Sequence, residues 1–177
     1  MRKRFHNQGF SLIEVLVTLV LLTIGMLALV AMQGRGIQFT SDSVARNNAI
    51  MLATEVLETM RANPGGRDDY LIEKLQADGE CAGDEVEVSD VTEQLTCWSE
   101  KARMLMPGAN GGEDDPVAVR NNFYICRSLQ AGACAADNGS TVEVQIAWRS
   151  NGERCREEDG EGDDDPFICT LRLRGEL

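Results

Sequence analysis

The side chains that could do chemistry in this chain of 177 residues are few and widely spaced. Glu14 is the one charged residue in the apolar run from Phe10 to Met32, where a lone carboxylate costs on the order of 3 kcal/mol. All six cysteines lie beyond this run, and His6 is the single histidine. The residue types point to an acid that needs a cationic partner and to thiols that can pair.

Histidine chemistry is absent from any mature form that loses the nine residues before Phe10, a basic leader, because His6 lies among them. Such a form can build no Ser-His-Asp triad, Cys-His nucleophile or histidine-ligated metal. Carboxylate, lysine and cysteine chemistry remains open, but no residue spacing supports it. We therefore expect no enzyme and no cofactor, and a membrane-tethered periplasmic enzyme is the weakest alternative.

The apolar run is long enough to cross a membrane. As a helix, Phe10 to Met32 would extend roughly 34 Å, against a hydrocarbon core of ~30 Å. Arg2, Lys3 and Arg4 precede the run without any acid, which keeps the leader on the cytoplasmic side. We expect a single pass through the inner membrane with the C-terminus in the periplasm.

The junction at the start of the run resembles that of the type IV prepilins. Their motif is a short basic leader ending in glycine, then phenylalanine, then a glutamate four residues later, and Gly9, Phe10 and Glu14 match it. The resemblance implies that a prepilin peptidase cuts between Gly9 and Phe10 and methylates the new amine of Phe10. It also implies that Glu14 docks subunits by neutralising the amino terminus of a neighbour in the filament.

Helical patterning continues beyond the membrane. Gly34 and Gly36 mark the exit, and each weakens a helix by ~1 kcal/mol; pilin-like helices often have a weak or melted section here. An amphipathic stretch from Ile37 to Arg61 follows, and Pro64 ends it. Its apolar face comprises Ala45, Ala49, Leu52, Val56 and Met60. The expected segments are a leader (1–9), a membrane and filament-core helix (10–33), its amphipathic continuation (34–62) and an acidic periplasmic domain (63–177).

One segment resembles a particular family of minor pilins. Glu58 to Pro64 reads ETMRANP, like the end of the first helix in PilV, the type IV pilus modification protein. The stretch GMLALVAMQ and a later helix ending in LMPG are similar too. The resemblance is good up to Pro64 and holds beyond it only in outline.

The C-terminal domain first shows helical and then alternating patterns. A helix capped by Ser89 or Asp90 is expected to carry a stripe that places Trp98 in the core, and Pro107 stops it. A short helix from Tyr70 to Ala77 is a further candidate. The stripe comprises Val91, Leu95, Trp98, Ala102 and Leu105.

Alternation over three later segments predicts an antiparallel sheet with one covered and one wet face. The segments are Asn122 to Leu129, Thr141 to Trp148 and Phe167 to Arg174, and Val117 to Arg120 is a candidate fourth. In the last strand, Phe167, Cys169, Leu171 and Leu173 are expected to face inward. The predicted fold is α+β and type IV pilin-like: a long N-terminal helix, half membrane and half amphipathic, packed on a small sheet and stapled by disulfides.

An even number of cysteines in an exported acidic domain favours disulfides over free or metal-bound thiols. Fifteen pairings of six cysteines exist. The local pairing Cys81–Cys97, Cys126–Cys134 and Cys155–Cys169 suits the outline of strands and loops.

Acidic residues dominate the C-terminal domain. Residues 64–177 hold 11 basic and 25 acidic residues, a balance of −14, so we expect no binding to nucleic acid. Asp163, Asp164 and Asp165 are a candidate calcium site, as in some secretion pseudopilins. Their spacing matches no EF-hand, and a solvated loop is the preferred interpretation.

The function that these observations favour is structural: a minor pilin that primes pilus assembly with other minor pilins and lies near the tip. The partners implied are the prepilin peptidase, the major pilin, the lipid bilayer, the inner-membrane assembly platform and a tip adhesin. A minor pseudopilin of a type II secretion system is the alternative, because both classes share the N-terminal motif.

Overall fold

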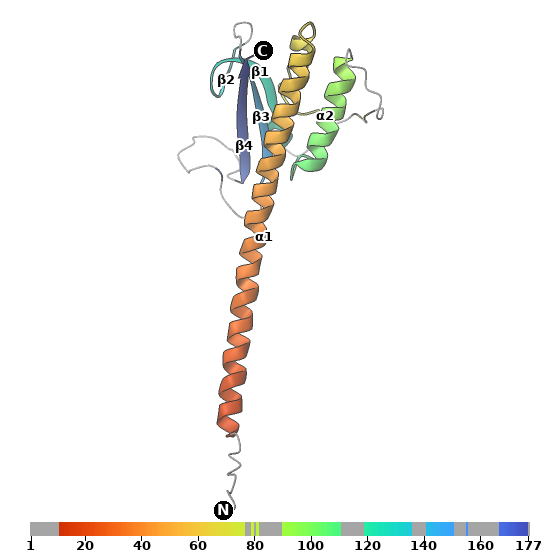
Figure 1. Cartoon of the computed structure of the whole chain (residues 1–177). Coiled ribbons are helices and arrows are strands. Elements are labelled where there is room, and N and C mark those ends of the chain that lie inside the picture. Colours follow the sequence, from red (N-terminus) through yellow and green to blue (C-terminus); the bar gives the residue numbers. More distant parts are fainter. Residues whose placement is uncertain are drawn as a thin grey trace, which may run out of the picture. The chain divides into compact units, whose positions relative to one another are not determined.

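The computed structural model describes residues 11–76, 79, 81, 90–110, 119–135, 141–150, 155 and 167–176. The chain forms two compact units, Met1–Thr40 and Ser41–Leu177. The first contains the N-terminal part of the helix α1, which spans Leu12–Ala62. The second contains the C-terminal part of α1, the helix α2 and a four-stranded sheet (Figure 1).

In the second unit, α1 buries one face, as its sequence period predicts. The five apolar positions at spacings of three and four are each at most 2% exposed. They are Ala45, Ala49, Leu52, Val56 and Met60. Ala53 and Leu57 widen this face, and Leu57 lies against Gly175 of the last strand. The helix ends at Ala62, just before Pro64, which lacks the N–H that a continuing helix would need.

Two short 3₁₀ turns correct the sequence prediction. The expected helix from Tyr70 to Ala77 is wrong where the structure describes it, because the turn η1 spans Arg67–Tyr70 and the chain then extends. Ile72 pairs there with Ile125, and this bridge requires extended backbone. The expected short strand at Val117 to Arg120 is likewise wrong over its described part, which belongs to the turn η2, Val119–Asn122.

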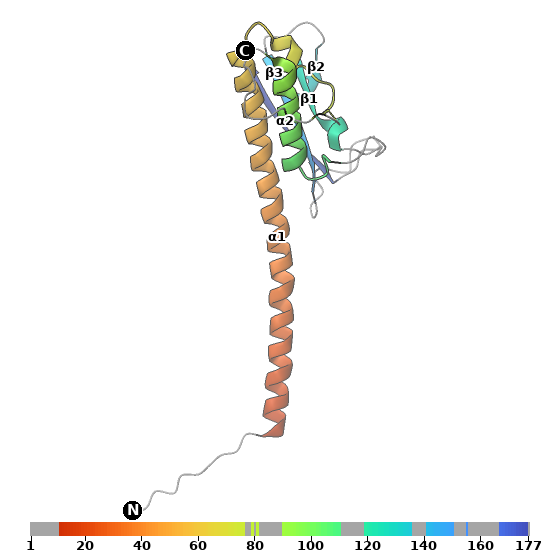
Figure 2. The same cartoon turned by 90° about the vertical axis from the view of Figure 1, so that its right-hand side faces the viewer.

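The helix α2 spans Val91–Leu105 and confirms the predicted cap and stripe. The Asp90 carboxylate accepts a hydrogen bond from the Glu93 N–H at 3.0 Å, which satisfies one of the free donors of the first turn. Trp98 is 6% exposed, and its indole Nε1 donates to the carbonyl of Leu52 at 3.0 Å. Two views show α2 alongside the C-terminal part of α1 (Figures 1 and 2), and this hydrogen bond joins them.

The sheet is antiparallel, with the strand order β2-β1-β3-β4. Its strands are β1 (Tyr124–Gln130), β2 (Ala133–Cys134), β3 (Thr141–Arg149) and β4 (Ile168–Glu176). The second half of α1 covers one face of this sheet, which we call the inner face. Val142, Val144, Ile146 and Trp148 point to it, as the alternation predicts.

Two details of the sheet differ from the prediction. The central strand β3 is buried on both faces, because the outer face carries a layer of hydrogen-bonded polar side chains rather than water-exposed ones. Phe167, expected inward, is 39% exposed, since β4 begins one residue later and Ile168 takes the buried position. Cys169 is buried and Leu171 and Leu173 are part-buried against the core, as expected.

Three disulfides lie in the second unit, and each joins cysteines that are near in sequence. Cys81–Cys97 links Cys81 to α2 with a Cα–Cα distance of 4.5 Å. Cys126–Cys134 joins β1 to β2 at 5.6 Å, and Cys155–Cys169 links Cys155 to the start of β4 at 5.0 Å.

Candidate functional site

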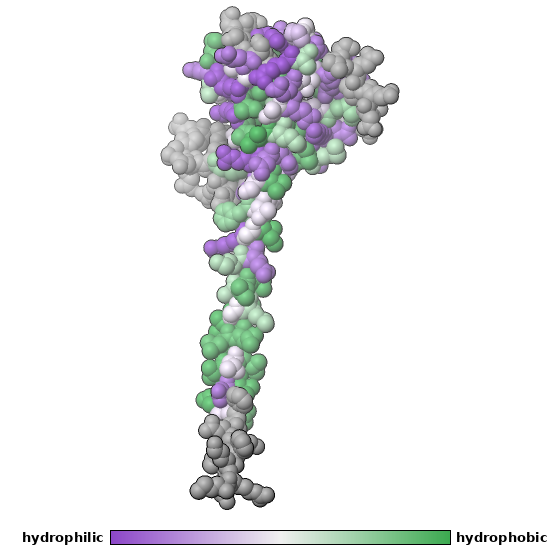
Figure 3. Space-filling model, in the orientation of Figure 1, coloured by the Kyte–Doolittle hydropathy of each residue, from purple (hydrophilic) through white to green (hydrophobic). Residues whose placement is uncertain are grey.

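The helix in the first unit is apolar on every side. Large apolar side chains between Leu12 and Met32 are 46–83% exposed, and none is buried. The space-filling view shows this as a nearly continuous hydrophobic surface over the described part of the segment (Figure 3). Among the described residues, α1 is the one helix long and apolar enough to span a membrane. Such a surface requires lipid or other helices around it.

Glu14 lies in the first turn of this helix. Its backbone N–H donates to the carbonyl of Ser11 at 3.0 Å, and a carboxylate at a helix N-terminus is favoured by the helix dipole. The hydroxyls of Thr18 and Thr23 donate to carbonyls within the same helix, at 2.9 and 2.8 Å. Among the described residues, nothing donates to the Glu14 carboxylate or forms an ion pair with it. The apolar segment therefore presents a single polar group that needs a partner.

Gly9 and Phe10, the predicted processing residues, lie outside the described part of the chain. The described part begins at Ser11, and α1 begins at Leu12. Asp163, Asp164 and Asp165 also lie outside it, so the calcium prediction has no structural test. Within the described residues, no group of three or more His, Cys, Asp or Glu side chains could hold a metal.

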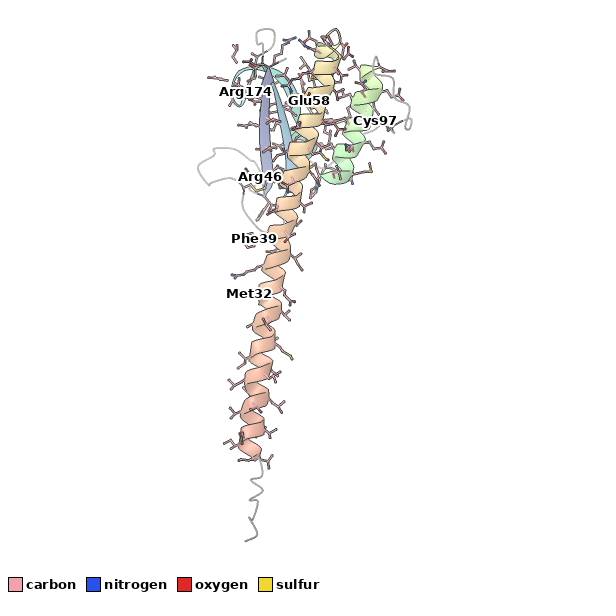
Figure 4. The ribbon with its side chains drawn as sticks, in the orientation of Figure 1. Met32, Phe39, Arg46, Glu58, Cys97 and Arg174 are labelled. Carbon is pink, nitrogen blue, oxygen red and sulfur yellow. A yellow bond between two sulfur atoms is a disulfide. The ribbon has the colours of Figure 1, made fainter. Side chains whose placement is uncertain are left out.

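The helix runs unbroken through its interior glycines. A Cβ atom added at Gly34 or Gly36 would meet nothing within 4 Å, and the same holds at Gly25. Neither packing nor backbone conformation in this chain therefore requires glycine at these positions. Figure 4 labels Met32 and Phe39, whose side chains project from the helix before and after the two glycines.

A hollow of about 320 Å³ lies between α1 and α2 in the second unit. Its lining is Glu55, Val56, Thr59, Tyr70, Gln94, Leu95, Cys97, Trp98 and Lys101. The Lys101 Nζ pairs with Glu55 Oε2 at 2.7 Å, and the Tyr70 hydroxyl is hydrogen-bonded to Gln94. These polar groups are paired with one another and Cys97 is in a disulfide, so the hollow offers no reactive group.

The outer face of the sheet holds a carboxylate that sequence reasoning missed. Glu143 in β3 is 0% exposed, and Oε1 accepts hydrogen bonds from the Tyr124 hydroxyl at 2.6 Å and the Gly132 N–H at 2.9 Å. Arg174 Nε lies 3.5 Å from Oε2. Alternation places Glu143 on the outer face, but a strand pattern alone gives no signal that neighbouring side chains cover that face.

This environment perturbs Tyr124. Burial, followed by the hydrogen bond to Glu143, raises the pKa of Tyr124 to about 12. The arrangement ties the turn at Gly132, which has a φ of +79°, to the central strand. We assign this arrangement a structural role, because the Glu143 carboxylate is buried and already accepts hydrogen bonds.

Comparison with protein families accounts for the N-terminal half of the chain. Residues 4–30 match the family model of the prokaryotic N-terminal methylation motif, and residues 31–101 match that of type IV pilin Tt1218. Neither a curated protein nor a solved structure matches the chain.

The first match, together with the exposed apolar helix, places the chain in the class of prokaryotic proteins that carry an N-terminal methylation motif. Adding the adjoining pilin match and the helix packed on a four-stranded sheet, the chain is a type IV pilin-like prepilin. It is thus a structural pilin subunit with an N-terminal membrane-anchoring helix. Its motif implies processing by a prepilin peptidase and assembly with other pilins.

Proposed function

We propose that this pilin is a minor subunit of a type IV pilus, which primes assembly with other minor pilins and lies near the tip. The resemblance of Glu58 to Pro64 to the PilV family supports a minor rather than a major role. The observation that carries the docking mechanism is Glu14, a carboxylate on a fully exposed apolar helix with no partner among the described residues, in a chain with a methylation motif.

In this proposal, processing creates a cationic partner for Glu14. Cleavage between Gly9 and Phe10 leaves a methylated amine on Phe10 at the start of the helix. Inside a bundle of such helices, that ammonium and the Glu14 carboxylate of a neighbouring subunit neutralise each other. A lone charge in hydrocarbon is costly, whereas a paired charge is tolerated. Register between subunits follows, because any other axial offset leaves both charges unpaired.

The chain then occupies two places in succession. The basic leader holds the N-terminus in the cytoplasm, so the apolar N-terminal part of α1 crosses the inner membrane once and the acidic domain lies in the periplasm. The prepilin peptidase, other minor pilins and the inner-membrane platform act on it there. After assembly it lies on the cell surface, below a tip adhesin and above the major pilin.

The mature N-terminus tests the processing step. Mass spectrometry of the protein from membranes should find residues 1–9 removed and one methyl group on the amine of Phe10. Gly9→Phe, which puts a bulky side chain at the junction, should accumulate the full-length form. An intact Met1 in the wild-type protein, or a cut beyond the apolar run, refutes the proposal.

Glu14 is tested by its effect on incorporation. Glu14→Gln should be cleaved normally, yet its amount in sheared pili relative to membranes should fall by roughly tenfold, the effect of losing about 1.4 kcal/mol of docking energy. Glu58→Gln is the control, since Glu58 pairs with Arg61 on the surface of the second unit (Figure 4). Equal incorporation of both variants contradicts a docking role for Glu14.

The alternative is a minor pseudopilin of a type II secretion system. The methylation motif fits both classes, whereas the match over residues 31–101 is to a type IV pilin and favours the pilus. Deleting the gene and scoring surface pili and secreted enzymes separately distinguishes them. Loss of pili with normal secretion supports the pilus, and the opposite result supports the pseudopilus.

A further inference from the structure

Arg120 is the one cationic residue that is buried among those that the structure describes. It lies in the turn η2 and is 7% exposed. Its carbonyl accepts hydrogen bonds from the N–H of Leu75 at 3.1 Å and from that of Phe123 at 3.2 Å. The backbone that carries this arginine is therefore held in place by two hydrogen bonds.

The guanidinium of Arg120 has no hydrogen-bond acceptor and no carboxylate among the described residues. Its Nε atom is enclosed and unsatisfied, whereas its two Nη atoms are not enclosed in this way. The small exposed part of the residue therefore includes the Nη edge of the guanidinium. Protein seals one side of this cation, and the opposite edge is open to a small group.

Other arginines of the second unit meet the cost of their charge in ordinary ways. Arg127 pairs with Asp68, and Arg174 Nε lies 3.5 Å from a carboxylate oxygen of Glu143. Arg46 pairs with no carboxylate in the described part of the chain, but it is exposed, so water solvates it (Figure 4). A buried guanidinium cannot lose its proton to avoid the cost of burial, as a buried amine can, and it needs an anion instead.

We propose that Arg120 binds a single carboxylate group, supplied by a free organic acid or by an acidic side chain of another protein. The N–H groups of a guanidinium form a planar fork that matches the two oxygens of a carboxylate. Since Nε is enclosed, the carboxylate binds end-on to the two Nη atoms. The exposed fraction is small, so the opening admits one such group rather than a large polyanion.

The charge around Arg120 favours an anion that carries a single charge. Arg103 donates to the carbonyls of Gln76 at 2.8 Å and Gly79 at 2.7 Å, and Gln76 follows Leu75, whose N–H bonds to Arg120. A second cation near this backbone attracts anions. Residues 64–177 as a whole hold 11 basic and 25 acidic residues, so they repel a doubly charged phosphate more than a carboxylate.

Nuclear magnetic resonance of the full chain in zwitterionic detergent micelles tests binding directly. The Nε–Hε cross-peak of Arg120, assigned by its absence in Arg120→Lys, should move saturably as sodium acetate is added, with half-saturation at about 1–30 mM. Sodium chloride at equal ionic strength should move it much less, because a spherical ion has no pair of oxygens to match the fork. No saturable shift up to about 200 mM acetate, or an equal shift with chloride, overturns the proposal.

A second titration distinguishes the sources of the carboxylate. A capped five-residue peptide with one central aspartate represents an acidic side chain of another protein, and acetate represents a free acid. Tighter binding of the peptide assigns the site to a protein partner, and equal or weaker binding assigns it to a free acid.

The chain's own acids at 113–115 are the competing occupant. They precede Arg120 by five to seven residues and lie outside the described residues. Glu113→Gln/Asp114→Asn/Asp115→Asn should leave acetate binding unchanged. Binding that appears only in this variant would show that the chain fills the site itself, and it overturns the proposal.

Thermal melts followed by near-ultraviolet circular dichroism give an independent readout. In about 100 mM acetate, the Tm of the second unit should rise by about 3–6 °C relative to chloride of equal ionic strength, since a ligand of the folded state stabilises it. Arg120→Met should lose this rise, and Arg120→Lys, which lacks the fork, replaces it if the methionine variant does not fold. Arg46→Met removes the same charge from the surface and should keep the rise (Figure 4). A rise that persists without Arg120 overturns the proposal.

Discussion

At the residue scale, two glutamates meet the free-energy cost of removing a carboxylate from water in opposite ways. Glu14 lies on an exposed apolar helix and has no partner in the described chain, whereas Glu143 is fully buried and accepts hydrogen bonds from Tyr124 and Gly132. A buried carboxylate is tolerated when donors surround it. The first glutamate therefore points to assembly, and the second belongs to the fold of the subunit.

Glu143 should matter for stability according to what replaces it. Glu143→Gln keeps an acceptor for Tyr124 but loses the charge facing Arg174, so we expect a loss of about 1–2 kcal/mol in the free energy of unfolding. Glu143→Ala leaves Tyr124, Gly132 and Arg174 without the carboxylate that they contact. It should lower the free energy of unfolding by about 3–5 kcal/mol. Denaturant melts of the full chain in detergent measure both, and equal small losses would show that the network carries little energy.

Tyr124 makes the same network visible by its titration. Its pKa is raised from 10.0 to about 12, chiefly by burial, so the folded protein holds this proton where an unfolded chain has lost it. The stabilisation is complete below pH 10 and is lost as the pH rises through the folded pKa, because the unfolded state then binds fewer protons. Ultraviolet titration of wild type against Tyr124→Phe isolates this tyrosine, and a midpoint near 10 contradicts the described environment.

At the element scale, α1 is one helix with two kinds of surface. Beyond residue 41 it buries a single face, of which Leu52 and Val56 are part, whereas from Leu12 to Thr40 all its residues are exposed. A helix that is apolar all round is completed by its surroundings, and an amphipathic one by its own domain. The change of pattern along α1 thus separates the part that other molecules must cover from the part that the subunit covers itself.

Gly34 and Gly36 provide the test at this scale. Since an added Cβ meets nothing at either position, Gly34→Ala/Gly36→Ala should stabilise the isolated helix by roughly 1 kcal/mol per site. If this stretch must melt on assembly, the double variant should enter pili less well while its helix content in detergent is unchanged or higher. Gly25→Ala, equally unobstructed in the apolar run, is the matched control. Normal incorporation of the double variant argues against a melted section.

At the scale of the whole molecule, the second unit is a modest α+β core reinforced by cross-links. One helix face, α2 and the inner face of the sheet form a single hydrophobic cluster, and the three disulfides fasten segments around it. Each disulfide that closes a short loop raises the free energy of unfolding by roughly 2–4 kcal/mol. A small domain gains stability in this way without a larger core.

Removing one of these disulfides should destabilise the second unit. Cys126→Ala/Cys134→Ala should lower the free energy of unfolding by about 2–4 kcal/mol, because the covalent link between β1 and β2 is lost. Thermal melts in detergent measure the loss. Peptide mapping without reduction should recover Cys81–Cys97, Cys126–Cys134 and Cys155–Cys169, and any crossed pair would contradict the connectivity.

The sequence by itself determined the elements whose signals are local and periodic. The apolar run, the buried face of α1, the Asp90 cap of α2 and the alternation of β3 follow from side-chain spacing along single elements. Membership of the type IV pilin class also follows from a continuous part of the sequence, the methylation motif and the segment after it.

Only the tertiary structure decided what depends on contacts between distant segments. Ile72 is extended rather than helical because its backbone pairs with that of Ile125. Glu143 is buried because Tyr124 and Gly132 cover it. The edge position of β4 is of the same kind, since strand order alone makes a strand outermost. Alternation tells which face of a strand is apolar, but pairing and coverage are long-range properties that no single segment encodes.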